Sequence, residues 1–249
     1  MSYLIPSDYK QSIQDANLQQ IIANDNSILL RAQLAAQEEA ASYLVQKYDI
    51  SQEFTDTKAW SNLVAYKAKA RVYNTNNVIY SAPTPYPEFD YGSTYNVNDL
   101  VFWKDHTYEC LIQTPLLDHD TGLQYRTIQG LPLANIAPDD ITNGSVYWKD
   151  LGAYTIPAGT DLTNTTYWSA IDNRGQAMVL RLVDLTLYHI HSRIAPRNIP
   201  DLRVKRYDEA IEWLKGCAKG DITPNLPILK PKQGGRIRYG GDVRNINTY

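Results

Sequence analysis

The sequence predicts an α+β protein in which a helical core of four or five helices is interrupted by a small inserted β subdomain and followed by an extended tail. Three observations predict this fold. Apolar residues repeat at helical spacing near both ends of the 249-residue chain, the middle is aromatic and alternates in polarity, and the last 28 residues hold three prolines and four glycines. We assign residues 1–79 and 173–221 to the core, 80–172 to the insert and 222–249 to the tail.

The first part of the core is expected to form three helices. Ser7 or Asp8 can cap a short one, and Asp25-Asn26-Ser27 opens a long one over about residues 27–48. Its apolar stripe, which Gln37 interrupts, consists of Leu30, Leu34, Ala41, Leu44 and Tyr48. A third helix is predicted over about residues 57–73, with an apolar face of Trp60, Val64, Ala68 and Val72 and a charged face of Lys58, Lys67, Lys69 and Arg71. We interpret the charged face as solvated surface.

The insert has the pattern of short strands. Residues 100–103 and 107–112 read as a β-hairpin with Lys104-Asp105-His106 between them, and the stretch from Pro115 to Gly144 reads as loop. A short repeat follows, because Asp-x-Thr-Asn precedes a Tyr-Trp pair twice, once ending at Tyr147-Trp148 and once at Tyr167-Trp168. Two copies are too few for a solenoid and predict two similar units in one subdomain.

The second part of the core is predicted to hold two more helices. One covers Gln176 to Ile194 and ends before Pro196 and Pro200, and the other starts at Asp201 and ends at Gly220. The tail carries five cations against one aspartate, a net charge of +4 that leaves −7 on the rest of the chain. This asymmetry favours docking on a partner. The residues we expect at that interface are Lys230, Lys232, Arg236, Arg238, Tyr239 and Arg244.

The sequence offers no set of residues for catalysis, a cofactor or a metal. His189 and His191 are two positions apart on a predicted helix and point to different faces, and Asp118-His119-Asp120 lacks the rest of a calcium loop. No phosphate-binding loop or hydrolase motif is present. The two cysteines, 107 residues apart, read as reduced thiols, and no signal peptide or membrane-spanning run is evident. We therefore expect a protein that is not an enzyme and needs no cofactor.

The aromatic residues allow two interpretations. The chain has 19 tyrosines but only 3 phenylalanines, and many of its rings fall in the insert. Exposed rings could form a glycan platform, for which the candidates are Trp103, Tyr147, Trp148, Tyr167 and Trp168. We favour the other interpretation, in which these rings form the core of a small subdomain with few aliphatic residues.

Two segments resemble the head–tail connector family of tailed phages, of the Mu-like head-completion or adaptor type. The carriers are Tyr3-Leu4-Ile5-Pro6-Ser7-Asp8-Tyr9, the alanine-rich stretch from Leu30 to Tyr48, the stretch from Val183 to Arg193, and Arg206-Tyr207-Asp208-Glu209-Ala210-Ile211-Glu212-Trp213-Leu214 with Ala218-Lys219-Gly220. Coverage is about residues 1–50 and 176–222. The family largely lacks residues 51–175, within which Asn98-Asp99-Leu100-Val101, Tyr108-Glu109-Cys110 and Tyr147-Trp148 resemble a small chitin-binding-type module.

The resemblance implies a structural virion protein, a neck ring or adaptor subunit that joins the portal to the tail and helps close the DNA channel. Its partners would be copies of itself in a ring, commonly of twelve, the portal and other neck or tail proteins. It would be assembled in the host cytoplasm, reside in the virion neck and not associate with a membrane. A carbohydrate-binding accessory protein or adhesin is the alternative. Contact with packaged DNA through the cations around Lys67 to Arg71 is a third option.

Overall fold

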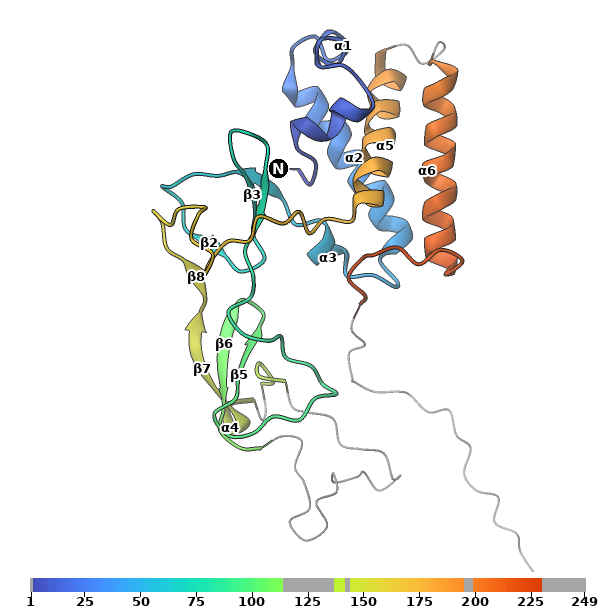
Figure 1. The fold of residues 1–249 in the computed structure, drawn as a ribbon. Coiled ribbons are helices and arrows are strands. Elements are labelled where there is room, and N and C mark those ends of the chain that lie inside the picture. Colours follow the sequence, from blue (N-terminus) through green and yellow to red (C-terminus); the bar gives the residue numbers. More distant parts are fainter. Residues whose placement is uncertain (1, 114–136, 142–143, 195–198, 230–249) are drawn as a thin grey trace, which may run out of the picture.

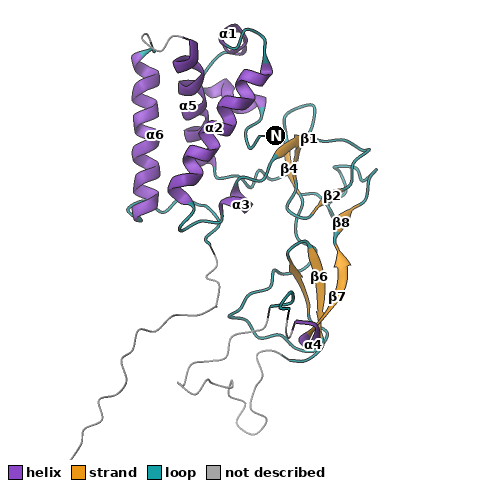
Figure 2. Cartoon of the chain, turned by 180° about the vertical axis from the view of Figure 1, so that it is seen from behind, coloured by secondary structure: helices purple, strands orange, loops and turns teal. Residues whose placement is uncertain are grey.

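The fold is α+β, as the sequence predicts, with a helical body at one end and a β arm that extends from it (Figures 1 and 2). The computed structural model describes residues 2–113, 137–141, 144–194 and 199–229. The body contains the elements η1 (Pro6–Gln11), α1 (Asp15–Ile21), α2 (Asn26–Leu44), α3 (Ile50–Glu53), α5 (Gln176–Ile194) and α6 (Asp201–Lys219). The arm contains β1 (Thr57–Ala59), β2 (Tyr66–Lys67), β3 (Arg71–Tyr73), β4 (Ile79–Ser81), β5 (Leu100–Trp103), β6 (His106–Cys110), α4 (Gly144–Tyr147), β7 (Trp148–Ala153) and β8 (Thr155–Ile156).

Three long helices, α2, α5 and α6, pack side by side to form the body (Figure 1). The Asp25 side chain accepts a hydrogen bond of 2.8 Å from the backbone N–H of Ser27, which caps the start of α2. Gly220 ends α6 with a φ of 95°, a left-handed conformation that glycine adopts without a steric penalty. The predicted helices over 176–194 and from Asp201 are confirmed.

The buried face of α2 differs from the predicted stripe. Leu44 and Tyr48 are buried, but Leu30 and Leu34 are exposed and α2 ends at Leu44. The face that meets α5 and α6 is made instead of Ala32, Gln33, Ala36, Ala40 and Leu44. Alanines at a spacing of four let the helices approach closely, and the larger side chains opposite them on α5 fill the core.

The prediction of a helix over residues 57–73 is wrong. The structure has three short strands there, β1, β2 and β3, so β structure begins at Thr57, ahead of the boundary at residue 79 suggested by the sequence. Strands of two or three residues carry too few side chains to show an alternating pattern. The predicted hairpin is confirmed as β5 and β6, and both Lys104 and Asp105 in its turn have positive φ, as a two-residue hairpin requires. Most of the predicted loop from Pro115 to Gly144 lies outside the described residues.

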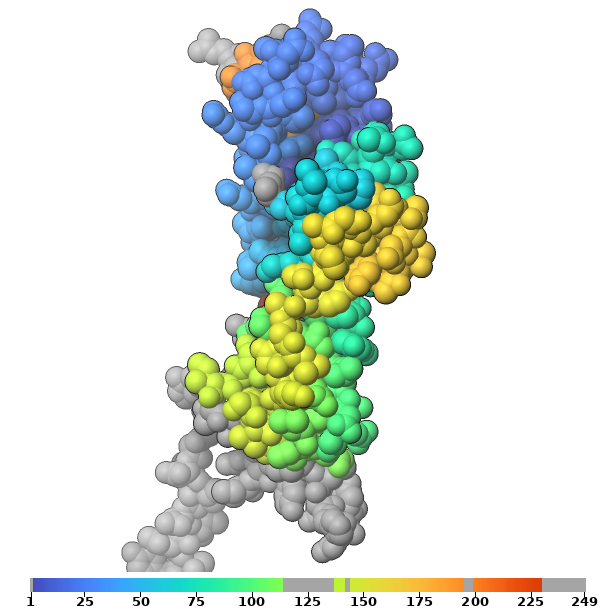
Figure 3. Space-filling model, turned by 90° about the vertical axis from the view of Figure 1, so that its left-hand side faces the viewer, coloured from blue at the N-terminus to red at the C-terminus, as the bar shows by residue number. Residues whose placement is uncertain are grey.

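The arm consists of two modules, one beyond the other (Figure 3). The proximal module, next to the body, comprises residues 57–82 and 154–171, with sheets β1-β3-β4 and β2-β8. The distal module comprises residues 86–113 and 137–153, with sheet β5-β6-β7. The distal module is thus inserted in sequence between β4 and the last part of the proximal module.

Both modules contain the same tyrosine anchor, 29 residues apart. The Tyr66 hydroxyl accepts a hydrogen bond from the backbone N–H of Ser61 at 2.8 Å and donates one to the Ser61 carbonyl at 3.1 Å. Tyr95 makes the same two bonds with Asp90, at 2.6 and 3.2 Å. In each case the hydroxyl is fixed to the residue five positions earlier, which closes a small loop and aims the ring into its module.

Each anchoring tyrosine meets the tryptophan of one copy of the Tyr-Trp repeat. The Tyr66 and Trp168 rings, and likewise those of Tyr95 and Trp148, lie edge to face with centroids 5.3 Å apart. Both tryptophans are 2% exposed, each in the core of its own module. The repeat found in the sequence therefore marks the closing segment of each module.

The backbone of the two modules also corresponds. Val72 pairs with Tyr80 across β3 and β4, as Val101 pairs with Tyr108 across β5 and β6. Just before these strands, Lys69 and Asn98 have φ values of 63° and 72°. Their backbone N–H groups donate at 2.9 and 2.8 Å to the carbonyls of Ala82 and Cys110, respectively. We conclude that the arm is a nested repeat of one module.

Replacing either closing tryptophan by alanine is expected to loosen its own module. Trp148→Ala removes a buried ring and should cost about 3–5 kcal/mol of local stability. Hydrogen exchange measured by mass spectrometry should then rise in β5 and β6 but not in β3, β4 or α5. Trp168→Ala should raise it in β3 and β4. Loss of protection in both modules from Trp148→Ala alone would mean that they do not fold as separate units.

Candidate functional site

The candidate site lies where the arm joins the body, because buried charged side chains from distant parts of the chain meet there. Five segments meet there: the N-terminal residues 2–8, α3, β1, β3 and the returning residues 171–175. The backbone N–H of Thr57 donates to the Ser2 carbonyl at 3.0 Å, which ties β1 to the N-terminus. We call the buried part of this region the joint.

Arg174 connects the returning segment to the N-terminal residues. Its side chain is 1% exposed and binds both carboxylate oxygens of Asp8, at 2.7 and 3.0 Å. It also binds both oxygens of Asp172, at 3.0 and 2.9 Å, and donates to the Tyr3 carbonyl at 3.0 Å. Burial alone would lower the pKa of Arg174, but the bonds to the two carboxylates outweigh it and raise that pKa. The guanidinium is therefore charged and geometrically fixed.

Arg71 fixes β3 to the body in a different way. It is 4% exposed and donates to the Glu53 carbonyl and to the Asn173 side-chain oxygen, both at 2.6 Å. Burial lowers its pKa, but arginine starts so high that it stays protonated. The sequence placed Arg71 on a solvated face, and that expectation is wrong because the strand turns this side chain into the joint.

The Tyr3 ring lies close to both guanidinium groups. Its centroid is 5.6 Å from Arg71 and 5.5 Å from Arg174, so both cations face the same ring. The Tyr3 hydroxyl donates a short hydrogen bond to the buried Glu53 carboxylate, which also accepts from the Gly175 N–H at 2.9 Å. Burial, then the Glu53 charge, raises the pKa of Tyr3, so the phenol keeps its proton and remains a donor.

Gly175 has no room for a side chain. A Cβ there would lie 2.8 Å from a Leu226 methyl carbon and 3.3 Å from a Glu53 carboxylate oxygen. The start of α5, α3 and residue 226 thus pack against each other through this glycine. The sequence does not predict that Tyr3, Glu53 and Arg174 meet. Its only signal near one of them is the return of a helical pattern at residues 173–176, beside Arg174.

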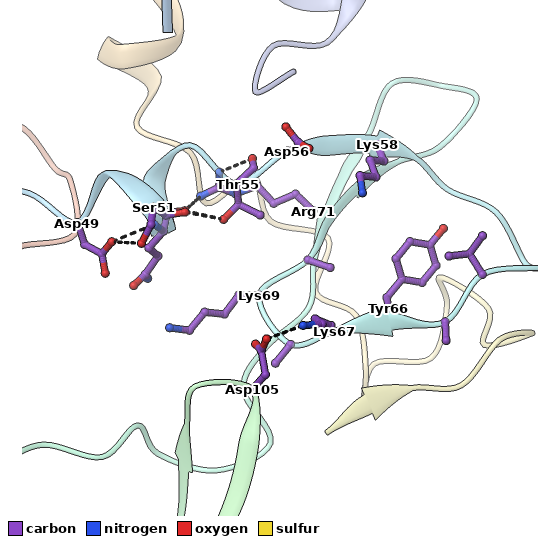
Figure 4. Close-up of a pocket in the computed structure, with 15 residues that line it drawn as sticks. Asp49, Ser51, Thr55, Asp56, Lys58, Tyr66, Lys67, Lys69, Arg71 and Asp105 are labelled. Carbon is purple, nitrogen blue, oxygen red and sulfur yellow. Dashed lines mark hydrogen bonds and ion pairs between the residues drawn. The ribbon is translucent and has the colours of Figure 1, made fainter. Parts of the chain in front are cut away.

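A groove of about 630 Å³ opens beside the joint, between α3 and strands β2 and β3 (Figure 4). Lys58, Lys67, Lys69 and also Arg71 line it, so the four cations assigned to one helix face do meet here, on strands and turns. Lys67 is 2.7 Å from Asp105, and Lys69 is 2.7 Å from Glu88. The groove is therefore of mixed charge, because two carboxylates of the distal module, Asp105 and Glu88, pair with Lys67 and Lys69.

The five residues of the candidate glycan platform do not form one surface. Trp148 belongs to the core of the distal module and Trp168 to that of the proximal module. Tyr147 and Tyr167 are half-buried against these separate cores. Trp103 is half-exposed, but Lys104 lies 5.5 Å from its ring centroid and its indole N–H donates to Asp139 at 2.5 Å. The arrangement supports the interpretation that these rings are core.

The other predicted interface residues, Lys230, Lys232, Arg236, Arg238, Tyr239 and Arg244, lie outside the described residues. The first part of the predicted tail is described and packs on the body. Leu226 is 7% exposed, and Ile228 forms an antiparallel bridge with Tyr48. Residues 222–229 are thus held by the body, in contrast to the wholly extended tail expected from 222 onward.

The residues that resemble the connector family contact each other across the body. The Tyr207 hydroxyl of α6 donates to Glu39 of α2 at 2.7 Å, and the Tyr207 ring stacks on Tyr188 of α5 with centroids 4.0 Å apart. His189 lies 3.0 Å from the same Glu39 carboxylate. Burial, then the Glu39 hydrogen bond, raises the pKa of Tyr207, so its phenol remains a donor.

No metal-binding group of three or more His, Cys, Asp or Glu residues occurs among the described residues. In the same part of the chain, no helix is long and apolar enough to cross a membrane. No family model, curated protein or solved structure matches the chain. The resemblance to the connector family therefore stays a prediction from the sequence.

Replacing Arg174 by methionine should strongly destabilise the protein. The change leaves Asp8 and Asp172 without their buried cation, which costs about 3–5 kcal/mol in comparable pairs. Urea unfolding followed by circular dichroism measures the loss. Lys149→Met is the matched control: it breaks an exposed pair with Glu109 and should cost no more than about 1 kcal/mol. Equal losses for the two variants would contradict the importance of the joint.

The joint should also make stability depend on pH at the acid end. Burial by itself raises the pKa of Asp172, but its bonds to Arg174 outweigh this and lower it below the ordinary value. An aspartate with a lowered pKa stabilises the folded state above about pH 4, and that stabilisation is lost as the pH falls through its folded pKa. Urea midpoints should therefore drop more steeply below about pH 4 for the natural protein than for Asp172→Asn. Parallel curves would rule out this contribution.

Proposed function

We propose that the chain is a structural subunit of a tailed-phage virion, a neck ring or adaptor that joins the portal to the tail. One observation supports it above the others. The segments that resemble the connector family, about residues 1–50 and 176–222, are separated by some 125 residues of sequence, yet they pack into one body. Their shared residues meet at Glu39, Tyr188 and Tyr207, one from each long helix. The intervening residues, about 51–175, leave the body intact because the joint holds the two ends of that stretch together.

In this proposal the body forms the ring, and the arm is an elongated projection carried by every subunit. Such a subunit needs rigid contacts and no chemistry, which agrees with a buried, charge-paired joint at the base of the arm. The lysines of the groove could in addition face packaged DNA, with which they would make weak, salt-dependent contact. The basic C-terminal residues would reach the portal or another neck protein, where arginine forks bind carboxylates with defined geometry.

The oligomeric state tests the proposal directly. Native mass spectrometry and negative-stain imaging of the full chain should show a closed ring, and mixing with a portal should give a complex of ring on ring. A monodisperse monomer that does not associate with a portal would count against the adaptor function. The measurement also gives the stoichiometry, for which the resemblance implies twelve.

Deleting residues 230–249 should abolish portal association while helical circular dichroism stays unchanged. The deletion begins at 230 because Leu226 is buried and Leu229 is hydrogen-bonded to Lys47, so that a cut at 223 would damage the body. Removing only residues 245–249 is the control, since it retains all six predicted interface residues. Full association of the chain ending at 229 would exclude the tail as the contact.

A further inference from the structure

An apolar stripe on α2 is exposed in the described part of the chain. Leu30, Leu34 and Val45 are 36%, 40% and 49% exposed, and Ala41 between them is half-buried. Spacings of four, seven and four residues place the four side chains on one side of the helix. Leu30, Leu34 and Ala41 belong to the stripe that the sequence assigned to the core, whereas α2 buries Ala32, Gln33, Ala36, Ala40 and Leu44 instead. We call Leu30, Leu34, Ala41 and Val45 the α2 stripe.

The surface is hollowed at both ends of the α2 stripe. At the N-terminal end, a hollow of about 480 Å³ is lined by Leu4, Leu18, Leu29 and Leu30 among others. At the C-terminal end, a hollow of about 290 Å³ is lined by Glu38, Ala41, Ile50 and Phe54 among others. We call the stripe and its two hollows the track, which offers apolar side chains and polar groups such as Gln33 and Gln37 to an extended segment.

The C-terminal part of the chain arrives at this track in a defined direction. The Asp49 N–H donates to the Pro227 carbonyl at 2.8 Å, and the Leu229 N–H donates to the Lys47 carbonyl at 2.9 Å. This ladder is antiparallel. Residue 229 therefore heads back toward the end of α2, and Val45 lies just two residues before Lys47. Residue 229 is thus brought close to Val45, the C-terminal end of the stripe, with no intervening linker.

The remaining 20 residues are long enough for the track and suited to it in chemistry. From Leu30 to Val45, the cap residue just after α2, there are 15 steps of about 1.5 Å, about 22 Å in all, whereas 20 extended residues reach about 66 Å. Residues 230–249 carry Ile237, Tyr239, Val243 and Ile246 between cations. Near the C-terminal end of the stripe, Glu38 lines the C-terminal hollow and Asp49 lines the groove beside the joint.

We propose that residues 230–249 fold back along α2 of the same copy and cover the α2 stripe, with Ile237 and Tyr239 as apolar anchors. Lys230 and Lys232 then lie near Glu38 and Asp49. We favour the same copy because the segment starts beside its own stripe. Its effective concentration there is in the millimolar range, so a separate chain would compete only at about that concentration. The inference goes beyond the proposed function. In the free subunit, residues 230–249 would cover the apolar α2 stripe, and assembly on the portal would release them from it.

A cysteine placed in the stripe tests this cover. Leu34→Cys is made in the full chain and in a chain ending at 229, and the rate of maleimide labelling is compared. The natural thiols of Cys110 and Cys217 are both buried, and burial raises the pKa of each, so the new thiol reacts selectively. A stripe covered nine-tenths of the time reacts about tenfold more slowly in the full chain.

Two controls separate cover from other effects. Leu63→Cys, at a residue of the proximal module that is 84% exposed, should label at the same rate in both chains. In the full chain, Ile237→Asp with Tyr239→Asp should restore fast labelling at position 34, whereas Asn245→Asp with Asn247→Asp should not. A synthetic peptide of residues 230–249, added to the chain ending at 229, should slow labelling again.

Three results would overturn the inference. Equal labelling rates of the Leu34→Cys variant with and without residues 230–249 would show that the stripe is uncovered. Slow labelling that persists when Ile237→Asp and Tyr239→Asp are combined would exclude the two anchors. Protection that rises with protein concentration would place the segment on another copy. Each readout is independent of ring formation and portal binding, so the proposed function can stand or fall separately.

Discussion

The two buried guanidinium groups at the base of the arm constrain the whole molecule. Arg71 and Arg174 both lie against one tyrosine ring, and each must keep its polar partners because an unpaired buried charge costs several kcal/mol. Those partners come from the N-terminus, α3 and the segment returning from the arm. Since every one of these segments is held by at least one guanidinium, the arm leaves the body and re-enters it at a single fixed place.

The arm shows how a long insertion can be added to a small helical body. Its proximal module uses Tyr66 and Trp168 to close on itself, and the distal module, with Tyr95 and Trp148, is placed in a loop of the first. Each module has its own core, so neither depends on the helices for burial of its rings. The result is a column in which body, proximal module and distal module follow one another (Figure 3).

Much of the fold could be predicted from local patterns, and the failures have identifiable causes. The helices from Gln176 and Asp201 and the hairpin at 100–110 have strong periodicity and clear ends, so their prediction is confirmed. The segment 57–73 failed because its strands are two or three residues long, and Val64, Ala68 and Val72 fall at helical spacing by chance. Lys58, Lys67 and Lys69 do line one groove, but the helix on which the sequence grouped them is wrong. The joint was not predicted, since Tyr3, Glu53 and Arg174 are far apart in the chain and each reads as an ordinary residue.

The sequence by itself determined that long helices start near Asp25, Gln176 and Asp201, that rings crowd the middle, and that the Tyr-Trp pair recurs. These are local properties, carried by side-chain spacing and by capping residues. Only the tertiary structure decided which face of α2 is buried, which repeat units nest within each other, and which charges lose contact with water. Those outcomes depend on what packs opposite each residue. Alanines admit close helix contact where leucines do not, and an arginine is buried only where carboxylates and carbonyls from distant segments converge on it.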